Sequence, residues 1–219
     1  MLLKKTLQYK ATRLLIKSSQ KNHPFTRSFA WAFSLPKLPP LHFHRWALFD
    51  HMTDLSKKDR PFYEFGVWRG EAFRYLIKTF KKGYGFDTFT GLTEKHIKDG
   101  SHPSVEEHNF ATPKHYCNYL EEVLNCHEAE GPISHIQKFE IVVGDVRNSM
   151  EPFLEQNPHV IFSLLYFDLD LYQPTKTVLE LIEPRIGKNC VIAFDQLNHS
   201  SFPGETEAFR EFFDLSDRQ

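Results

Sequence analysis

Residues 62–70 read Phe62-Tyr63-Glu64-Phe65-Gly66-Val67-Trp68-Arg69-Gly70, a short apolar run that meets two glycines four positions apart. An amphipathic segment follows, and a second short run then ends in an acid, Asp87. This order is that of a strand, a tight turn, a helix and a second strand. It predicts the nucleotide-binding opening of a doubly wound α/β fold.

The number of glycines in this turn narrows the class of ligand. A dinucleotide fingerprint needs G-x-G-x-x-G, so that the backbone can lie close to a pyrophosphate. Here Glu64 stands where the first glycine would be, and the pattern becomes E-x-G-x-x-x-G. A carboxylate at the end of a strand suits a cationic or amine-bearing ligand better than a diphosphate.

The rest of the chain continues the alternation of strands and helices. Apolar runs predict strands at 61–67, 84–87, 139–143, 161–168 and 190–195. Helical spacing predicts helices at 42–55, 70–81, 113–126, 174–186 and 205–213. The polar, His-rich part of 88–135 is interpreted as a solvated lid. We therefore expect a Rossmann-like, mostly parallel sheet with helices on both faces.

Acidic residues follow two of the later strands. Asp168 and Asp170 end the 161–168 run, and Asp195 ends the 190–195 run. The carboxyl ends of parallel strands lie along one edge of the sheet, so Glu64 and Asp87 are expected at the same crevice. Five acids in one crevice repel one another unless a metal ion or a cationic ligand is present.

The glycine turn followed by Asp87 resembles motif I of the class I S-adenosylmethionine-dependent methyltransferases. In that class the turn passes under the amino-acid end of the cofactor, and the acid after the second strand holds the ribose hydroxyls. The resemblance implies S-adenosylmethionine as the cofactor, with the binding residues Glu64, Gly66, Gly70, Asp87, Asp145 and Val146. For Asp145, placed near the adenine by the resemblance, capping of the next helix is the alternative.

A closer resemblance covers roughly residues 60–210. The segments FYEFGVWRGEAF, GFDTFTGL, GDV, DLDLYQPTKTVLE, PRI and FDQ are similar to the macrocin O-methyltransferase (TylF-type) family, whose members methylate sugar hydroxyls and depend on Mg²⁺. The resemblance implies Asp170 as the general base and Asp168, Asp195 and Gln196 as Mg²⁺ ligands. Gln196 replaces a second acid of the family, although an amide oxygen can still ligate a hard cation. His199 is a candidate second base, yet a loop histidine is more often merely exposed.

We expect the chain to transfer a methyl group to a hydroxyl of a small molecule, with a sugar favoured. One alternative is an NAD-dependent oxidoreductase, against which the missing glycine counts. Another is a non-catalytic interaction module with the methyltransferase fold. No nucleic-acid partner is expected, because the catalytic half is acidic.

Charge divides the chain into two parts. Residues 1–49 carry nine Lys and Arg and no acid, whereas the remainder carries 18 basic and 28 acidic residues. We expect 1–58 to be a basic, helical N-terminal extension and 59–219 to be the cofactor-binding domain. The basic helix is open to three interpretations: docking on its own domain or a partner subunit, contact with an anionic membrane surface, and targeting. Docking is favoured.

Five strands are found where the methyltransferase fold usually has seven. Residues 214–219 leave no room for the final antiparallel pair, so we expect either a C-terminal truncation or a partner that covers the last strand. A homo-oligomer through the extension or through this edge is one consequence. Three scattered cysteines without C-x-x-C fit a reducing compartment, and we expect a cytoplasmic protein. No run of eighteen apolar residues predicts a membrane span.

Overall fold

The computed structural model describes residues 40–42, 44–131 and 135–213. Its contacts divide the chain into two compact units, Met1–Phe43 and His44–Gln219. The second unit begins before the expected domain boundary at residue 58, because helix α3 (Arg45–Leu55) packs into its core. The expected basic N-terminal helix lies outside the described residues, as do residues 214–219.

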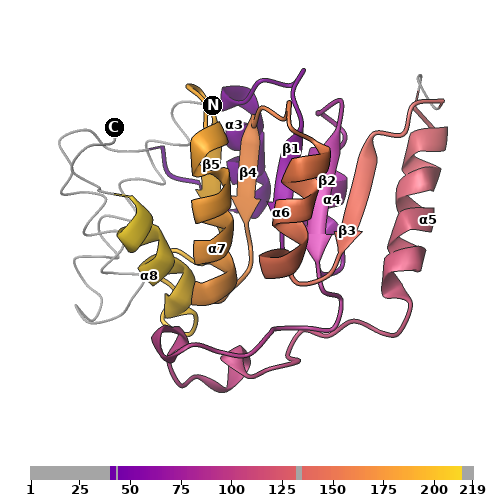
Figure 1. Cartoon of the computed structure of the whole chain (residues 1–219). Helices are drawn as coiled ribbons and strands as arrows, with labels where there is room; N and C mark the ends of the chain where they lie inside the picture. The colour runs from indigo at the N-terminus through magenta and orange to yellow at the C-terminus, as the bar shows by residue number, and fades with distance from the viewer. Residues whose placement is uncertain (1–39, 43, 132–134, 214–219) are drawn as a thin grey trace. The chain divides into compact units, whose positions relative to one another are not determined.

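The second unit is built on a parallel sheet (Figure 1). Its strands are β1 (Phe62–Phe65), β2 (Gly83–Asp87), β3 (Phe139–Val143), β4 (Leu164–Phe167) and β5 (Val191–Phe194). Their order across the sheet is β3-β2-β1-β4-β5, and every neighbouring pair is parallel. The expected Rossmann-like, doubly wound fold is therefore confirmed.

Helices cover both faces of this sheet. They are α3, α4 (Glu71–Leu76), α5 (Tyr116–Ala129), α6 (Val146–Gln156), α7 (Tyr172–Ile182) and α8 (Pro203–Phe212). Short 3₁₀ turns occur at Ile97–Asp99 (η1), Pro103–Val105 (η2) and Glu183–Arg185 (η3). Among the described residues, no helix has the length and apolar character needed to cross a bilayer.

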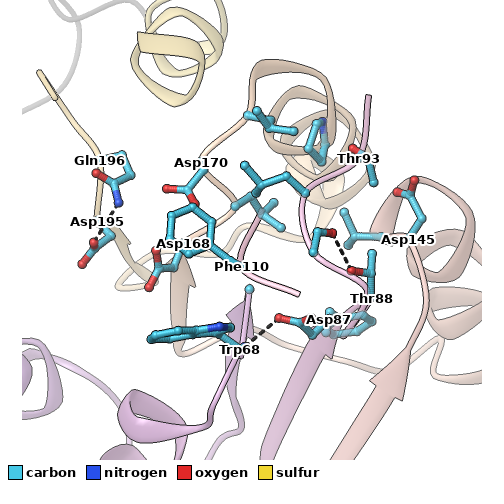
Figure 2. Close-up of a pocket in the computed structure, with 18 of the residues that line it drawn as sticks. Trp68, Asp87, Thr88, Thr93, Phe110, Asp145, Asp168, Asp170, Asp195 and Gln196 are labelled. Carbon is cyan, nitrogen blue, oxygen red and sulfur yellow. Dashed lines mark hydrogen bonds between the residues drawn. The ribbon is translucent and has the colours of Figure 1, made fainter. Parts of the chain in front are cut away.

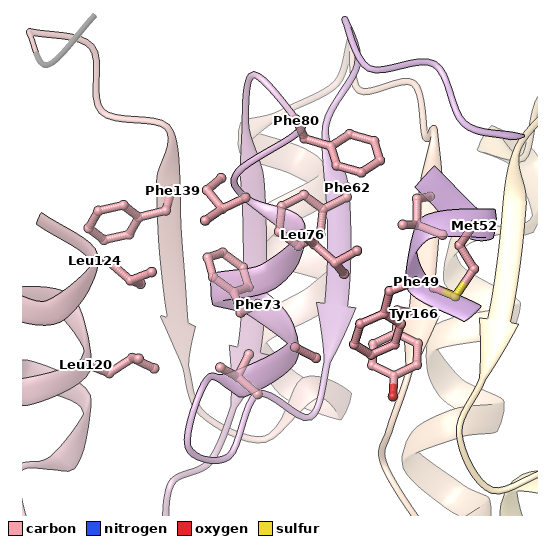
Figure 3. Packing of buried hydrophobic residues seen from close by; sticks show 14 of the residues in the cluster. Phe49, Met52, Phe62, Phe73, Leu76, Phe80, Leu120, Leu124, Phe139 and Tyr166 are labelled. Carbon is pink, nitrogen blue, oxygen red and sulfur yellow. The ribbon is translucent and has the colours of Figure 1, made fainter. Parts of the chain in front are cut away.

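Successive residues of the central strands serve opposite faces. Phe62 packs with Phe49 of α3, Leu76 of α4 and Leu120 of α5 in one cluster (Figure 3). The next residue, Tyr63, belongs to a second cluster, built with α6, α7 and the chain around α8. All four residues of β1 and of β4 are buried, as expected for strands covered on both sides.

Strand register brings the residues of interest to one edge. Phe65 of β1 pairs with Phe167 of β4, which in turn pairs with Phe194 of β5. The residues that follow these three leave the sheet side by side, because parallel strands in register end at the same level. The edge so formed is the carboxyl edge, where open α/β sheets bind their ligands.

Candidate active site

A pocket of about 260 Å³ lies at this carboxyl edge. Figure 2 shows acidic side chains on one side of it and the residues that follow β2 and β3 on the other. Both groups of side chains come from turns directly after strands, which is why residues far apart in sequence share one cavity.

The first turn after β1 requires glycine. Gly66 has a φ of +91°, and a Cβ there would meet the backbone oxygen of Asp168 at 1.9 Å. Gly66 lines the pocket, whereas Gly70 does not. Gly70, at φ +74°, is the N-cap of α4 and leaves room for the Leu120 side chain, and its expected contact with a cofactor stays a prediction.

Asp87 lies in the pocket at the end of β2. Its carboxylate accepts the backbone N–H of Trp68 at 2.7 Å and that of Phe89 at 2.6 Å. Burial raises the pKa of Asp87 above its ordinary value, and the backbone donors oppose this. A carboxylate has acceptor capacity beyond these two bonds, and hydroxyl donors of a ligand can use it.

Asp145 combines the two expectations stated for it. Its side chain accepts the backbone N–H of Arg147 at 2.9 Å and thereby caps α6. It also lines the pocket, together with Val146 and Gly144. A helix-capping carboxylate thus forms part of the wall opposite the acidic side chains.

Aromatic residues and two unpartnered polar atoms complete the cavity. Trp68 and Phe110 meet edge to face, with ring centroids 6.2 Å apart, and Phe202 lies on Phe110 at the same distance. Two buried oxygens that line the pocket, Thr93 Oγ1 and Asp170 Oδ1, have no hydrogen-bond partner within the described ranges. Buried polar atoms are usually paired, so these two indicate space for a ligand with hydrogen-bonding groups.

The His-rich stretch is exposed at His102, His108 and His115, but it is also held to the domain by specific contacts. His96 and His102 cap the turns η1 and η2, and His96 stacks on Tyr172 at 4.7 Å. Asp99 is fully buried and accepts the backbone N–H of Tyr172 at 2.6 Å. These contacts hold the segment against α7. Two other residues of the same segment, Thr93 and Phe110, line the pocket.

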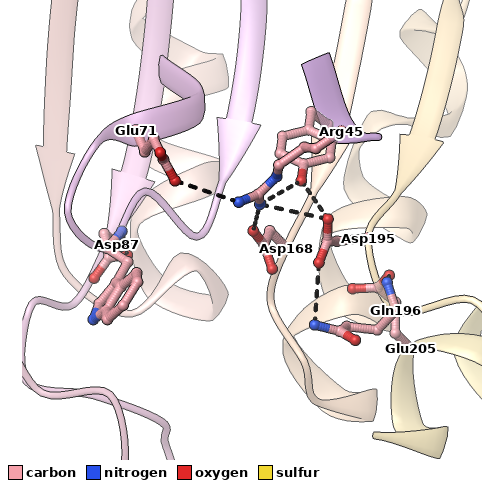
Figure 4. Close-up of polar contacts among 9 residues, drawn as sticks. Arg45, Glu71, Asp87, Asp168, Asp195, Gln196 and Glu205 are labelled. Carbon is pink, nitrogen blue, oxygen red and sulfur yellow. Dashed lines mark hydrogen bonds and ion pairs between the residues drawn. The ribbon is translucent and has the colours of Figure 1, made fainter. Parts of the chain in front are cut away.

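A guanidinium lies between the acids of the other side (Figure 4). Arg45 Nη2 is 3.2 Å from Asp168 Oδ2 and 3.5 Å from Asp195 Oδ1. It also donates to the hydroxyl of Tyr166 at 3.1 Å, and that hydroxyl donates to Asp195 Oδ1 at 2.6 Å. The two carboxylates do converge on one cation, and the cation belongs to α3.

Asp170 stands apart from this ion pair. Its backbone has φ +64°, so the strand alternation that predicts Asp168 and Asp170 on one side does not apply beyond β4. Burial, with repulsion from Asp195, raises the pKa of Asp170 to about 7, while the Gln196 amide opposes this. A carboxyl with a pKa near neutrality is suited to proton transfer at physiological pH.

Two glutamates lie behind the pocket. Glu64 is only 1% exposed and does not line the cavity, so its expected direct contact with a cofactor does not follow from the structure. Glu205 is fully buried and accepts the backbone N–H of Gln196 at 2.9 Å. Burial, followed by the fields of neighbouring acids, raises the pKa of both well above the ordinary range.

The structure does not bring His199 to the pocket. Its Nδ1 accepts the backbone N–H of Ser201, and its ring lies against Phe202 at 5.3 Å on the exposed loop after β5. The ring contacts its own loop, and the role of His199 as a second base stays a prediction.

The side chains expected to hold Mg²⁺ are engaged in other contacts. Arg45 forms ion pairs with Asp168 and Asp195, and the Gln196 amide nitrogen donates a hydrogen bond to Asp195 Oδ2 at 3.2 Å. Within the described part of the chain, no group of three or more His, Cys, Asp or Glu is arranged to hold a metal ion. As arranged, Asp168, Asp195 and Gln196 do not fit a divalent cation, because a guanidinium already lies between the two carboxylates.

Among the comparisons with known proteins, only the one with solved structures finds similar proteins. No protein-family model matches the sequence, and no curated protein does. A crystal structure of CalS11, a calicheamicin methyltransferase, aligns over 99% of this chain and 87% of its own, with 30% identity and a TM-score of 0.74. An apo structure of CalS11, described as a TDP-rhamnose 3'-O-methyltransferase of calicheamicin biosynthesis, aligns over 98% and 87% with 28% identity and a TM-score of 0.64.

The parallel sheet, the glycine turn after β1 and the acid that ends β2 define an α/β protein whose pocket lies at the carboxyl edge, where open α/β sheets bind their ligands. With the likeness to CalS11, the assignment becomes specific. The chain belongs to the class I S-adenosylmethionine-dependent methyltransferases.

Sequence reasoning missed Arg45 and Tyr166 as members of the site. Arg45 lies 123 residues before Asp168, and no motif joins them. Tyr166 does carry a signal, because it precedes Asp168 by two in a strand and therefore shares its side of the sheet. The aromatic pair of Trp68 and Phe110 had no such signal, since Phe110 comes from the long segment after β2.

Proposed function

We propose that this chain is an S-adenosylmethionine-dependent O-methyltransferase of the macrocin type, acting on a hydroxyl of a sugar or a glycosylated small molecule. The observation that carries the proposal is one pocket with an Asp87 end and an Asp170 end. The likeness to CalS11, a sugar O-methyltransferase by its description, supports the acceptor class. An NAD-dependent oxidoreductase is the competing function.

The cofactor's nucleoside is assigned to the half of the pocket around Asp87. Asp87 would accept the ribose hydroxyls, and Thr88, Asp145 and Val146, which line the same half, would border the adenine. The turn at Gly66 would pass beneath the amino-acid end of the cofactor. These residues fit such a ligand, because they combine a carboxylate with acceptor capacity and an apolar and aromatic wall.

The acceptor hydroxyl is assigned to the half around Asp170. Bound S-adenosylmethionine supplies an electrophilic methyl group on a sulfonium. As the acceptor oxygen forms its bond to the methyl carbon, the carbon–sulfur bond breaks, its electron pair stays on sulfur, and Asp170 takes the hydroxyl proton. Alignment of the two reactants supplies much of the rate. Magnesium has no part in this scheme, because Arg45 already holds the two carboxylates.

Calorimetry with S-adenosylhomocysteine and with NAD tests this function. We expect S-adenosylhomocysteine to bind and NAD not to bind. Asp87→Ala should weaken S-adenosylhomocysteine binding by about ten- to hundredfold, the scale of charge-assisted hydrogen bonds worth about 1.5–3 kcal/mol. Asp54→Ala, which removes an exposed acid of α3, is the matched control and should bind as the wild type does. Equal affinity in wild type and Asp87→Ala would remove the ribose assignment, and binding of NAD alone would favour the oxidoreductase.

A further inference from the structure

The acidic half of the pocket contains its own cation. Arg45 Nη2 contacts one carboxylate after β4 and one after β5, which are the two that the family resemblance assigns to a metal. Arg45 Nη1 lies 3.8 Å from Glu71 of α4. The guanidinium is thus bounded by acids from three elements of the fold (Figure 4).

Packing holds the helix that carries Arg45. Phe49, one turn further along α3, is fully buried and meets the ring of Tyr166 edge to face at 5.3 Å. The guanidinium of Arg45 lies over the Phe49 ring at 5.5 Å. The packing of Phe49 in the core therefore fixes the helix that carries Arg45, and Tyr166, Asp168 and Asp195 fix its guanidinium.

The position of Arg45 is otherwise unfavourable for a cation. It is the first residue of α3, and the N-terminus of a helix carries partial positive charge. Its guanidinium is also half-buried, and burial disfavours the charged form. A cation at such a place indicates that the facing carboxylates outweigh both effects.

The identity of Gln196 agrees with a monovalent cation. An amide at this position leaves two carboxylates, Asp168 and Asp195, against one guanidinium. Both oxygens of Asp195 are occupied, Oδ1 by Tyr166 and Arg45 and Oδ2 by Gln196. A divalent ion placed here would compete with these donors for the Asp195 oxygens and be repelled by the guanidinium.

We propose that Arg45 is the resident cation of this site and does the work that a divalent ion does in metal-assisted methyl transfer. Its N–H groups hold Asp168 and Asp195 in place and face the acceptor oxygen as that oxygen gives its proton to Asp170. This inference rests on the proposed function. Arginine suits the role because its guanidinium stays charged at every physiological pH and presents several donors in a fixed plane.

Binding of Mn²⁺ to the metal-free full chain, followed by electron paramagnetic resonance, tests the inference without any turnover. The wild type should show no saturable Mn²⁺ binding below about 1 mM, the weak end of protein sites for divalent cations. Arg45→Met should bind Mn²⁺ at least about tenfold more tightly, since the positive charge between the two carboxylates is then gone. Arg45→Lys keeps a cation and should behave as the wild type. Arg210→Met, which removes an exposed arginine of α8, is the matched control.

Mn²⁺ binding gained by Arg45→Met and lost again in Arg45→Met with Asp168→Asn supports the inference. Equal binding by wild type and Arg45→Met, whether tight or absent, would overturn it. Should Arg45→Met fail to fold by thermal melting, Arg45→Gln replaces it. Failure to bind S-adenosylhomocysteine would defeat the proposed function, whereas the Mn²⁺ result depends only on Arg45 and its two carboxylates.

Discussion

At the scale of single residues, Asp170 has the properties that are most closely tied to catalysis. It combines a left-handed backbone, a pKa of about 7 and a buried carboxyl oxygen that has no hydrogen-bond partner among the described residues. A non-glycine residue at positive φ costs about 1–3 kcal/mol, and such strain often accompanies functional positions. The motif D-x-D predicts that an acid stands here, but not that the chain turns at it, because the left-handed φ is set by tertiary contacts after β4 ends.

The raised pKa of Asp170 makes a prediction for the pH dependence of methyl transfer. The base acts in its deprotonated form, so turnover should rise about tenfold per pH unit below pH 7 and level off above it. A pH–rate profile with saturating cofactor measures this. Asp54→Asn, on the outer part of α3, should give the same profile as the wild type. A rate that stays constant from pH 5 to pH 9 would contradict the role of Asp170.

The turn between β1 and α4 decides the geometry at the scale of elements. At this turn Gly66 packs directly against the backbone of Asp168. The ends of β1 and β4 therefore meet without a side chain between them. The sequence pattern predicts this turn, since two glycines after an apolar run need no tertiary information. It cannot separate the two glycines by role, because Leu120, which fills the space beside Gly70, comes from a distant helix.

Alanine at Gly66 should damage the fold as well as the site. The change places a Cβ against a backbone oxygen at a positive φ, and we expect a loss of about 3 kcal/mol or more in the free energy of unfolding. Urea denaturation gives this value. Gly187→Ala is the matched control, because a Cβ there meets nothing within 4 Å, and it should be neutral or slightly stabilising. Similar stabilities for the two variants would show that the turn at Gly66 relaxes freely.

At the scale of the whole molecule, the parallel sheet explains why most residues of the pocket's acidic edge could be predicted from the sequence. Each strand ends in a recognisable residue, and parallel register alone then places Gly66, Asp87, Asp168 and Asp195 along one edge. The position of Arg45 could not be predicted in this way. It comes to the carboxyl edge from α3, a helix before β1, and helix packing leaves no local motif in the sequence. Helix α6 is also absent from the helices predicted by periodicity, since Pro152 lies within it and proline usually interrupts a helix. The direction of His199 could not be predicted either, because it lies in the irregular loop after β5.

The measurement that tests the central claim most directly is transfer of a labelled methyl group from S-adenosylmethionine to a panel of sugar acceptors that includes TDP-rhamnose. The wild type should form a methyl ether without added metal. Asp170→Asn, which keeps the shape and removes the basicity, should be slower by roughly 10²–10⁴-fold with S-adenosylhomocysteine affinity nearly unchanged. No labelled product from any acceptor, or near-full turnover by Asp170→Asn, would contradict a methyltransferase that uses this carboxylate as its base.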